Sequence, residues 1–279
     1  MRFERYFRDR RPDDLSNIHS VTKSVVSTLT GIAINDGYLA LETALGEIFD
    51  ERCLGDDPRK RLIRVEHLLT MTSGLEADTP HDIDEIADRG ESWIEGPLQA
   101  PLREDPGSIF IYNNGAAHVL GAVLARASRV RLAEFAEEKL FAPLGIDTYR
   151  WPTDPDDNPL GYGHLELRPR DLMRLGELYL ASGRLGATQL VPSEFVAAAT
   201  ESQASGGPPE EVDYGYLWWV TEDGGYRSFF AGGFGGQYVT VVPDLELVVV
   251  TTGDVDVFIE TSCNLRRLVG EVVIPTLFA

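Results

Sequence analysis

The tetrapeptide Ser20-Val21-Thr22-Lys23 begins the stretch that decides the fold, SVTKSVVSTLTGIAIND (residues 20–36). After Lys23 this stretch carries no charged residue until Asp36, and its apolar and small residues recur at helical spacing. Asn35-Asp36-Gly37 is typical of a helix end. The pattern therefore predicts a helix over residues 21–36 in apolar surroundings, with Ser20 at its start.

Ser20 and Lys23 are one helical turn apart and therefore lie on the same face of this helix. A serine hydroxyl is a weak nucleophile that needs a base beside it. A lysine held away from water loses its proton more readily and can serve as that base. The alternative is structural, with Ser20 as a helix cap and Lys23 as a solvated side chain. The apolar run after Lys23 favours the nucleophile and its base.

A second candidate element is Ile111-Tyr112-Asn113-Asn114, directly before a helical pattern over residues 113–128. A tyrosine phenol can carry a proton to a leaving group. An asparagine side chain such as that of Asn114 can orient a catalytic group or donate to a substrate carbonyl. The alternative is a tyrosine packed in the core, followed by an asparagine that caps the helix.

The third element is a glycine-rich, strand-like run, FAGGFGGQ (residues 230–237). Glycine within a strand often marks the close approach of a ligand or of another backbone. At the edge of a cleft, a strand of this kind can donate a backbone N–H group to the oxyanion that forms when a nucleophile attacks a substrate carbonyl. The alternative is a bulge or a tight packing contact.

Composition excludes several classes of protein. Lys plus Arg number 25 and Asp plus Glu number 45, a net charge of −20 that argues against binding nucleic acid or an anionic membrane surface. No apolar run reaches the roughly 18 residues that span a bilayer. Cys53, Cys263 and the five histidines have no metal-ligand spacing, so no metal and no cofactor are expected. The N-terminal residues show no signal peptide, which favours a cytoplasmic protein.

The order of elements predicts an α+β fold. Strand-like patterns cover residues 1–7, 214–220, 226–230, 236–242 and 245–252, and helical patterns cover residues 65–70, 113–128, 132–141, 170–182 and 255–277. We therefore expect an antiparallel sheet built from both chain ends and flanked by helices, with a mostly helical insertion. The expected sheet domain is 1–38 with 212–279, the expected helical domain is 39–211, and the active site lies in the cleft between them.

Taken in order, the three elements resemble the serine β-lactamase and penicillin-binding protein superfamily. Its marks are Ser-x-x-Lys, Tyr-x-Asn and a strand with Lys/His-Thr/Ser-Gly. Residues 68–75 (LLTMTSGL), 106–115 (PGSIFIYNNG), 143–145 (PLG) and 214–219 (YGYLWW) resemble other segments of the family, so the similarity covers nearly the whole chain. The branch it resembles most is the class C β-lactamase-related serine hydrolases, which include esterases and 6-aminohexanoate-dimer hydrolases.

The resemblance implies the β-lactamase/transpeptidase-like fold and acyl transfer. Ser20 would attack a carbonyl while Lys23 and Tyr112 move the proton, and water would then hydrolyse the acyl-enzyme. The resemblance also implies that the backbone N–H groups of Ser20 and Phe234 would donate to the oxyanion. Asn114 would orient Lys23 or the substrate. The residues that would contact the substrate are Gly233, Gly235 and Trp218.

Two features depart from the family pattern. The third mark is Ala231-Gly232-Gly233, so the cationic residue that lies near the substrate carboxylate in β-lactamases and transpeptidases is absent. Family members also usually have more sequence before the nucleophile, which implies a truncated, mis-started or unusually short N-terminus here.

We therefore expect a serine hydrolase that acts through an acyl-enzyme on an ester or amide of a small molecule and is not an efficient β-lactamase. The alternatives are a β-lactamase, a D-amino-acid peptidase, or a sensor of the same fold that is acylated without turnover. The sequence leaves the identity of the substrate and the oligomeric state open.

Overall fold

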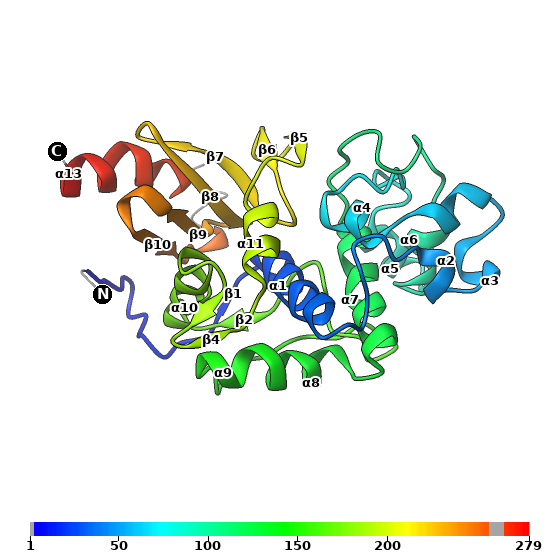
Figure 1. Cartoon of the computed structure of the whole chain (residues 1–279), viewed down its shortest axis with the longest axis horizontal. Helices are drawn as coiled ribbons and strands as arrows, with labels where there is room; N and C mark the ends of the chain where they lie inside the picture. The colour runs from blue at the N-terminus through cyan, green and yellow to red at the C-terminus, as the bar shows by residue number, and fades with distance from the viewer. Residues whose placement is uncertain (1–2, 257–264, 279) are drawn as a thin grey trace.

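A six-stranded antiparallel sheet with the strand order β10-β9-β8-β7-β6-β5 occupies one end of the molecule (Figure 1). This computed structural model describes residues 3–256 and 265–278. The strands are β5 (Ala204–Gly207), β6 (Val212–Tyr214), β7 (Trp219–Asp223), β8 (Tyr226–Gly233), β9 (Gln237–Val242) and β10 (Leu247–Thr251). The expected mixture of helices with an antiparallel sheet is confirmed.

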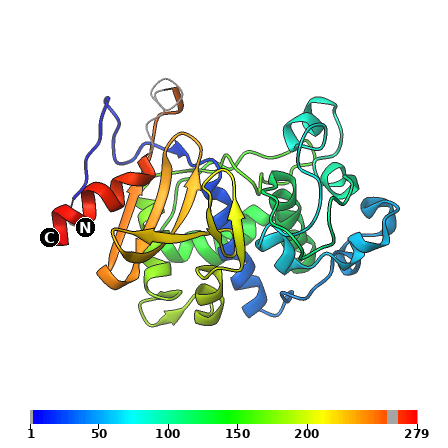
Figure 2. The same cartoon turned by 90° about the horizontal axis from the view of Figure 1, so that it is seen from above.

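Helix α1 (Val21–Asn35) lies between this sheet and a helical region (Figure 2). Residues 21–33 are all buried, which explains why the sequence of α1 is apolar or small on every face. The hydroxyls of Ser24 and Ser27 donate to the backbone carbonyls of Leu217 and Tyr216, both at 2.6 Å. Helix α1 is thereby fastened to the turn that joins β6 to β7.

The other elements agree with most of the expected positions. The helices are α2 (Leu45–Ile48), α3 (Glu51–Leu54), α4 (Val65–Leu69), α5 (Ile83–Asp88), α6 (Glu95–Gln99), α7 (Asn114–Ser128), α8 (Leu132–Ala136), α9 (Ala142–Leu144), α10 (Pro169–Leu180), α11 (Ser193–Ala199) and α13 (Ile274–Phe278). Short 3₁₀ or π segments lie at Pro58–Leu62, Glu137–Phe141, Pro243–Leu245, Leu265–Arg267 and Val269–Val273. Two small ribbons pair β1 (Ser16–Asn17) with β2 (Glu166–Leu167), and β3 (Arg184–Leu185) with β4 (Thr188–Gln189).

The strand expected at the N-terminus is wrong for the described residues 3–7, which form no strand. Its alternating pattern lacks a buried face, because Phe3 and Phe7 are 78% and 64% exposed. Glu4 instead forms an ion pair with Arg170 of α10 at 2.8 Å. The six strands of the sheet therefore all come from residues 204–251, and the N-terminal part of the chain contributes only β1 to a separate ribbon.

A second correction concerns the strand expected over residues 214–220. The chain turns at Leu217, whose φ is +56°, so β6 ends at Tyr214 and β7 begins at Trp219. The backbone N–H of Gly215 donates to the carbonyl of Trp218 across this turn at 2.8 Å. Within the helical pattern expected over 255–277, residues 255–256 and 265–277 are helical, including 3₁₀ and π segments, and residues 257–264 lie outside the described residues.

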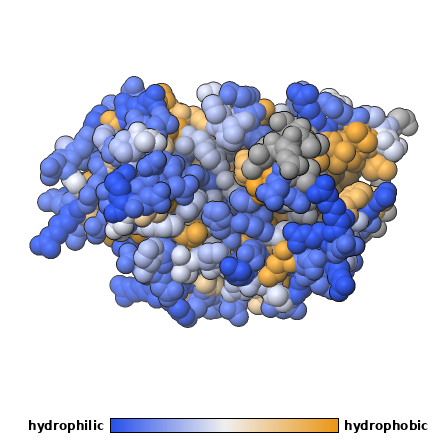
Figure 3. Space-filling model, turned by 180° about the vertical axis from the view of Figure 1, so that it is seen from behind, coloured by the Kyte–Doolittle hydropathy of each residue, from blue (hydrophilic) through white to orange (hydrophobic). Residues whose placement is uncertain are grey.

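The expected division into a sheet domain and a helical domain stays a prediction, and one helix of the insertion packs on the sheet. Gly176 of α10 lies so close to the sheet that a Cβ there would be 2.5 Å from Val248 of β10. Hydrophilic residues cover most of the face shown in Figure 3, which agrees with the net charge of −20. In the part of the chain that the structure describes, no helix has the length and apolarity needed to cross a membrane.

Candidate active site

Ser20 occupies the position before the first turn of α1, after a residue in a left-handed conformation. His19 has a φ of +47°, and the side chain of Ser20 makes no capping hydrogen bond to the helix. Its Oγ instead accepts a hydrogen bond of 2.9 Å from Lys23 Nζ. This contact favours the pairing of a nucleophile with a base over the helix-cap interpretation.

Lys23 is only 2% exposed, and its amino group lies among neutral groups. Nζ donates to Ser20 Oγ and, at 2.6 Å, to the backbone carbonyl of Tyr162. Burial lowers the pKa of Lys23 to about 7, because the ammonium form loses its hydration in the interior. Near neutral pH a large fraction of Lys23 is therefore an uncharged amine with a lone pair for a proton.

Tyr112 lies beside this amino group. Lys23 Nζ is 4.9 Å from the centre of the Tyr112 ring, and the ring of Trp219 stacks on Tyr112 with 5.9 Å between centroids. Burial raises the pKa of Tyr112 to about 12, an effect opposed by a side-chain hydrogen bond with Ser20 and reinforced by the charge of Glu210. Tyr112 therefore keeps its proton near neutral pH and can donate it.

The segment over residues 68–75 holds Tyr112 in place. The backbone N–H of Ile111 donates to the carbonyl of Met71 at 2.8 Å, and Asn113 Nδ2 donates to the carbonyl of Leu75 at 3.2 Å. Asn113 also caps α7, because its Oδ1 accepts from the N–H of Ala116 at 2.9 Å. The capping asparagine of the Tyr112 element is therefore Asn113, and Asn114 is the first residue of the helix.

Asn114 has a buried side-chain oxygen with no hydrogen-bond partner among the described residues. Lys23 donates its hydrogen bonds to Ser20 and Tyr162, and none of them joins it to Asn114. A buried acceptor without a partner is costly, and a donor on a substrate would satisfy it.

The end of β8 lies directly against the start of α1. A Cβ on Gly233 would be 2.4 Å from the carbonyl oxygen of Ile18 and 3.3 Å from the backbone nitrogen of Ser20, so only glycine allows this approach. The next residue, Phe234, is 51% exposed and its ring contacts that of His19. Gly235 has a φ of +81°, and a Cβ there would meet Val255. Gly233 therefore lies beside the backbone of Ser20.

The placement of Trp218 contradicts its expected role as a substrate contact. Trp218 is fully buried, and its ring packs on Tyr179 and Phe229 at centroid distances of 4.3 and 5.6 Å. The next residue, Trp219, points to the opposite face of β7 and stacks on Tyr112. A side chain enclosed in the core cannot contact a substrate, so Trp218 is a core residue.

Sequence reasoning missed two further groups at the site. The Tyr162 carbonyl comes from an irregular loop, and a backbone acceptor has no signature in the sequence. Glu210 comes from the loop between β5 and β6, and its Oε1 accepts from the Tyr238 hydroxyl at 3.1 Å. Within residues 3–256 and 265–278, no group of three or more His, Cys, Asp or Glu side chains is placed to hold a metal ion.

The arrangement has the parts that acyl transfer needs: a hydroxyl, an amine of lowered pKa in contact with it, and a protonated phenol beside both. The Beta-lactamase family model matches residues 2–271. The chain belongs to this family. It is thus a hydrolase of the serine β-lactamase family, whose members include esterases and penicillin-binding proteins.

Individual relatives show the breadth of the family. Penicillin-binding protein 4 of Amycolatopsis lactamdurans is 22% identical over 96% of this chain and 80% of its own length. Esterase EstB of Burkholderia gladioli is 30% identical over 71% of this chain, which spans only 55% of that esterase. The structure of a candidate 6-aminohexanoate-dimer hydrolase from Bacillus anthracis superposes with a TM-score of 0.77 at 21% identity, covering 90% of this chain and 70% of that one, and shows the same fold.

A serine-directed phosphonate is expected to label Ser20. The hydroxyls of Ser24 and Ser27 are buried and donate to backbone carbonyls, so they are poor targets. Peptide mapping by mass spectrometry after labelling measures the site, with Ser20→Ala as the unlabelled control. An adduct at Ser24 or Ser27 in the unmodified protein would contradict the assignment of Ser20.

Hydrolysis of an activated ester is expected to depend on pH through Lys23. The base must be the neutral amine, so kcat/KM should fall about tenfold for each pH unit below about 7 and level off above it. Because the pKa of Tyr112 is about 12, loss of its proton should not lower the rate below pH 10. A profile that is flat between pH 5 and pH 9 would show that Lys23 is not the base.

Proposed function

We propose that this chain is a serine hydrolase that forms an acyl-enzyme on Ser20, with neutral esters or amides of small molecules as substrates. The observation that carries the proposal is the 2.9 Å contact between Ser20 Oγ and the buried amino group of Lys23. A hydroxyl in contact with an amine whose pKa is about 7 is an activated nucleophile at neutral pH.

The proposed reaction begins when the neutral Lys23 amine takes the proton of Ser20 as Oγ attacks the substrate carbonyl. The oxyanion accepts hydrogen bonds from the backbone N–H groups of Ser20 and Phe234, which the close approach of Gly233 supports. Tyr112 donates its proton to the leaving group and is reprotonated from Lys23. Asn114 orients the substrate through its buried side-chain oxygen.

Water then hydrolyses the acyl-enzyme by the same route in reverse. Tyr112 and Lys23 together remove a proton from the water as it attacks the acyl carbon. The bond between Ser20 Oγ and the acyl carbon breaks, and the proton returns to Ser20. The product acid leaves, and the free enzyme is restored.

The electrostatics beside the site favour neutral over anionic substrates. Ala231, in the position of the family's cationic residue, is a small side chain buried in β8. Arg227, the arginine nearest to it in sequence, donates to the carbonyl of Thr200 at 2.7 Å. The carboxylate of Glu210 lies beside Gly232, where a Cβ would be 3.3 Å from its Oε1. Burial raises the pKa of Glu210, and the Tyr238 hydroxyl and the charge of Arg266 oppose this shift. When Glu210 is ionised, a substrate carboxylate bound beside it faces a negative charge, which disfavours β-lactams and peptide C-termini.

Two alternatives differ from this proposal in measurable ways. A sensor of the same fold would be acylated and stop, whereas a hydrolase gives a burst followed by steady turnover. A β-lactamase or D-amino-acid peptidase would favour substrates with a carboxylate. The intact Ser20, Lys23 and Tyr112 favour an enzyme over a sensor.

With a p-nitrophenyl acyl ester, the unmodified protein is expected to show steady turnover. Tyr112→Phe keeps the ring that stacks on Trp219 but removes the proton, and should lower kcat by roughly 10² to 10⁴. Stopped-flow and steady-state rates measure both effects, with Ser20→Ala as the inactive reference. Acylation without turnover would support the sensor, and a Tyr112→Phe rate equal to that of the unmodified protein would leave Tyr112 with a packing role only.

The unmodified protein is expected to have a much higher kcat/KM for this ester than for a chromogenic cephalosporin. Glu210→Gln should raise the ratio of cephalosporin to ester turnover by roughly three- to tenfold, because it removes a negative charge near the bound carboxylate. Glu211→Gln, at the exposed neighbouring position, is the matched control and should leave the ratio unchanged. Efficient cephalosporin turnover by the unmodified protein would overturn the proposed substrate class.

A further inference from the structure

The loop between α9 and α10 carries a buried polar cluster that the mechanism above does not use. Its centre is His118 of α7, whose side chain is fully buried. His118 Nε2 lies 3.1 Å from Asp154 Oδ2, and His118 Nδ1 accepts a hydrogen bond of 3.2 Å from the backbone N–H of Gly161. The rings of Trp93 and Tyr162 pack on the imidazole from two sides.

These contacts assign the roles of the two ring nitrogens of His118. Because Nδ1 accepts from the backbone N–H of Gly161, the ring proton is assigned to Nε2. Nε2 therefore donates to the carboxylate of Asp154. Burial raises the pKa of Asp154, but hydrogen bonds from His118 and Asn158 outweigh this effect and lower it overall, so the carboxylate is charged. The pair presents one defined acceptor, Nδ1, to the loop.

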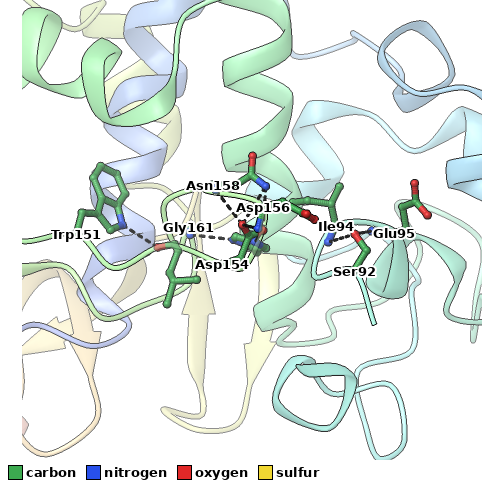
Figure 4. Close-up of polar contacts among 10 residues, drawn as sticks. Ser92, Ile94, Glu95, Trp151, Asp154, Asp156, Asn158 and Gly161 are labelled. Carbon is green, nitrogen blue, oxygen red and sulfur yellow. Dashed lines mark hydrogen bonds and ion pairs between the residues drawn. The ribbon is translucent and has the colours of Figure 1, made fainter. Parts of the chain in front are cut away.

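Asp154 also organises the loop around itself. Its Oδ1 accepts from the backbone N–H groups of Asp156 and Asn158 at 2.9 and 2.8 Å, and the side-chain amide of Asn158 donates to both carboxylate oxygens. The indole of Trp151 donates to the carbonyl of Leu160 at 2.9 Å. Figure 4 shows these contacts gathered on the stretch that leads to Gly161.

The loop then packs closely against the backbone of α7 at Gly161. A Cβ on Gly161 would be 2.7 Å from the carbonyl oxygen of Ala117 and 3.2 Å from His118 Cα. Immediately after this contact comes Tyr162, whose carbonyl accepts the 2.6 Å hydrogen bond from Lys23 Nζ. The N–H that His118 holds and the carbonyl that holds the amine of Lys23 therefore belong to consecutive residues, Gly161 and Tyr162.

The carbonyl of Tyr162 decides where the lone pair of Lys23 points. A neutral amine has two N–H groups and one lone pair, and it accepts the Ser20 proton only when that lone pair faces Oγ. A hydrogen bond from one N–H to a fixed carbonyl restricts rotation about the Cε–Nζ bond. We propose that His118, held by Asp154, is a positioning residue for the base: through Gly161 it fixes the Tyr162 carbonyl that orients Lys23.

This inference rests on the proposed role of Lys23 as the base, and its test includes a readout independent of activity. The chain has three lysines, Lys23, Lys60 and Lys139, so carbon-13 at the lysine ε position gives three NMR signals, and Lys23→Arg assigns that of Lys23. The titratable groups that face or lie near Lys23 are Tyr112, Tyr162, His19 and His164. None of them is changed in the variants below.

His118→Phe keeps a ring but removes both hydrogen bonds, whereas His118→Asn keeps an acceptor near the position of Nδ1. In His118→Phe we expect kcat to fall about 10- to 100-fold while KM changes little, because the amine is misplaced rather than the substrate. The directly titrated pKa of Lys23 should fall by about one unit, because its ammonium form loses a well-placed acceptor. His118→Asn should recover part of both effects.

Gly161→Ala disturbs the same contact between His118 and the loop, because its Cβ would clash with α7. It should have the same effects on kcat and on the pKa of Lys23 as His118→Phe, and it serves as the test variant if His118→Phe does not fold. Val123→Ala is the matched control, because Val123 is a fully buried residue of α7 five positions further along the chain. It should lower the unfolding temperature but leave kcat and the pKa of Lys23 unchanged.

If the folded His118 and Gly161 variants behave like Val123→Ala, the cluster is only structural and the inference is wrong. Absence of ester turnover in the unmodified protein would overturn the proposed function, whereas the titration of Lys23 would still decide the positioning role.

Discussion

The burial of the Lys23 amino group is the constraint on which the rest of the site depends. An ammonium in the protein interior is costly, so the interior shifts Lys23 toward the neutral form that a base requires. Water is kept away by three segments that are distant in sequence: helix α1, the Tyr112 ring before α7, and the Tyr162 loop. Ser20 just before α1, the Tyr112 ring and the Tyr162 carbonyl also contact the amine, so the same segments exclude water and align the amine.

The burial of Lys23 that lowers its pKa for catalysis also lowers the free energy of unfolding. The pKa of Lys23 is about 7 in the folded protein and about 10.5 when solvated, so the unfolded chain binds more protons between these pH values. Lys23 therefore destabilises the fold by roughly 4 to 5 kcal/mol below pH 7, and this cost decreases as the pH rises from about 7 to 10.5. Helix α1, which is buried over residues 21–33 and whose Ser24 and Ser27 hydroxyls donate to the neighbouring turn, offsets part of the cost.

Much of the site follows from local patterns, and the remainder does not. Ser20 and Lys23 were predictable as neighbours because helical spacing alone brings them to one face. Trp218 and Trp219 were not distinguishable, because successive residues of a strand face opposite sides and the sequence does not mark where β7 begins. His118 has no motif of its own, since its role depends on a loop more than 30 residues further along the chain.

The sequence by itself determined helix α1, the strands β8 to β10 and the family, because these depend on periodicity and on short motifs. Only the tertiary structure decided that residues 3–7 lie outside the sheet, that Asn113 rather than Asn114 caps α7, and that a backbone carbonyl of Tyr162 holds Lys23. The physical reason is that burial and hydrogen bonding between distant segments depend on the folded surroundings of each group. An alternating pattern becomes a strand only where a partner strand and a buried face are available.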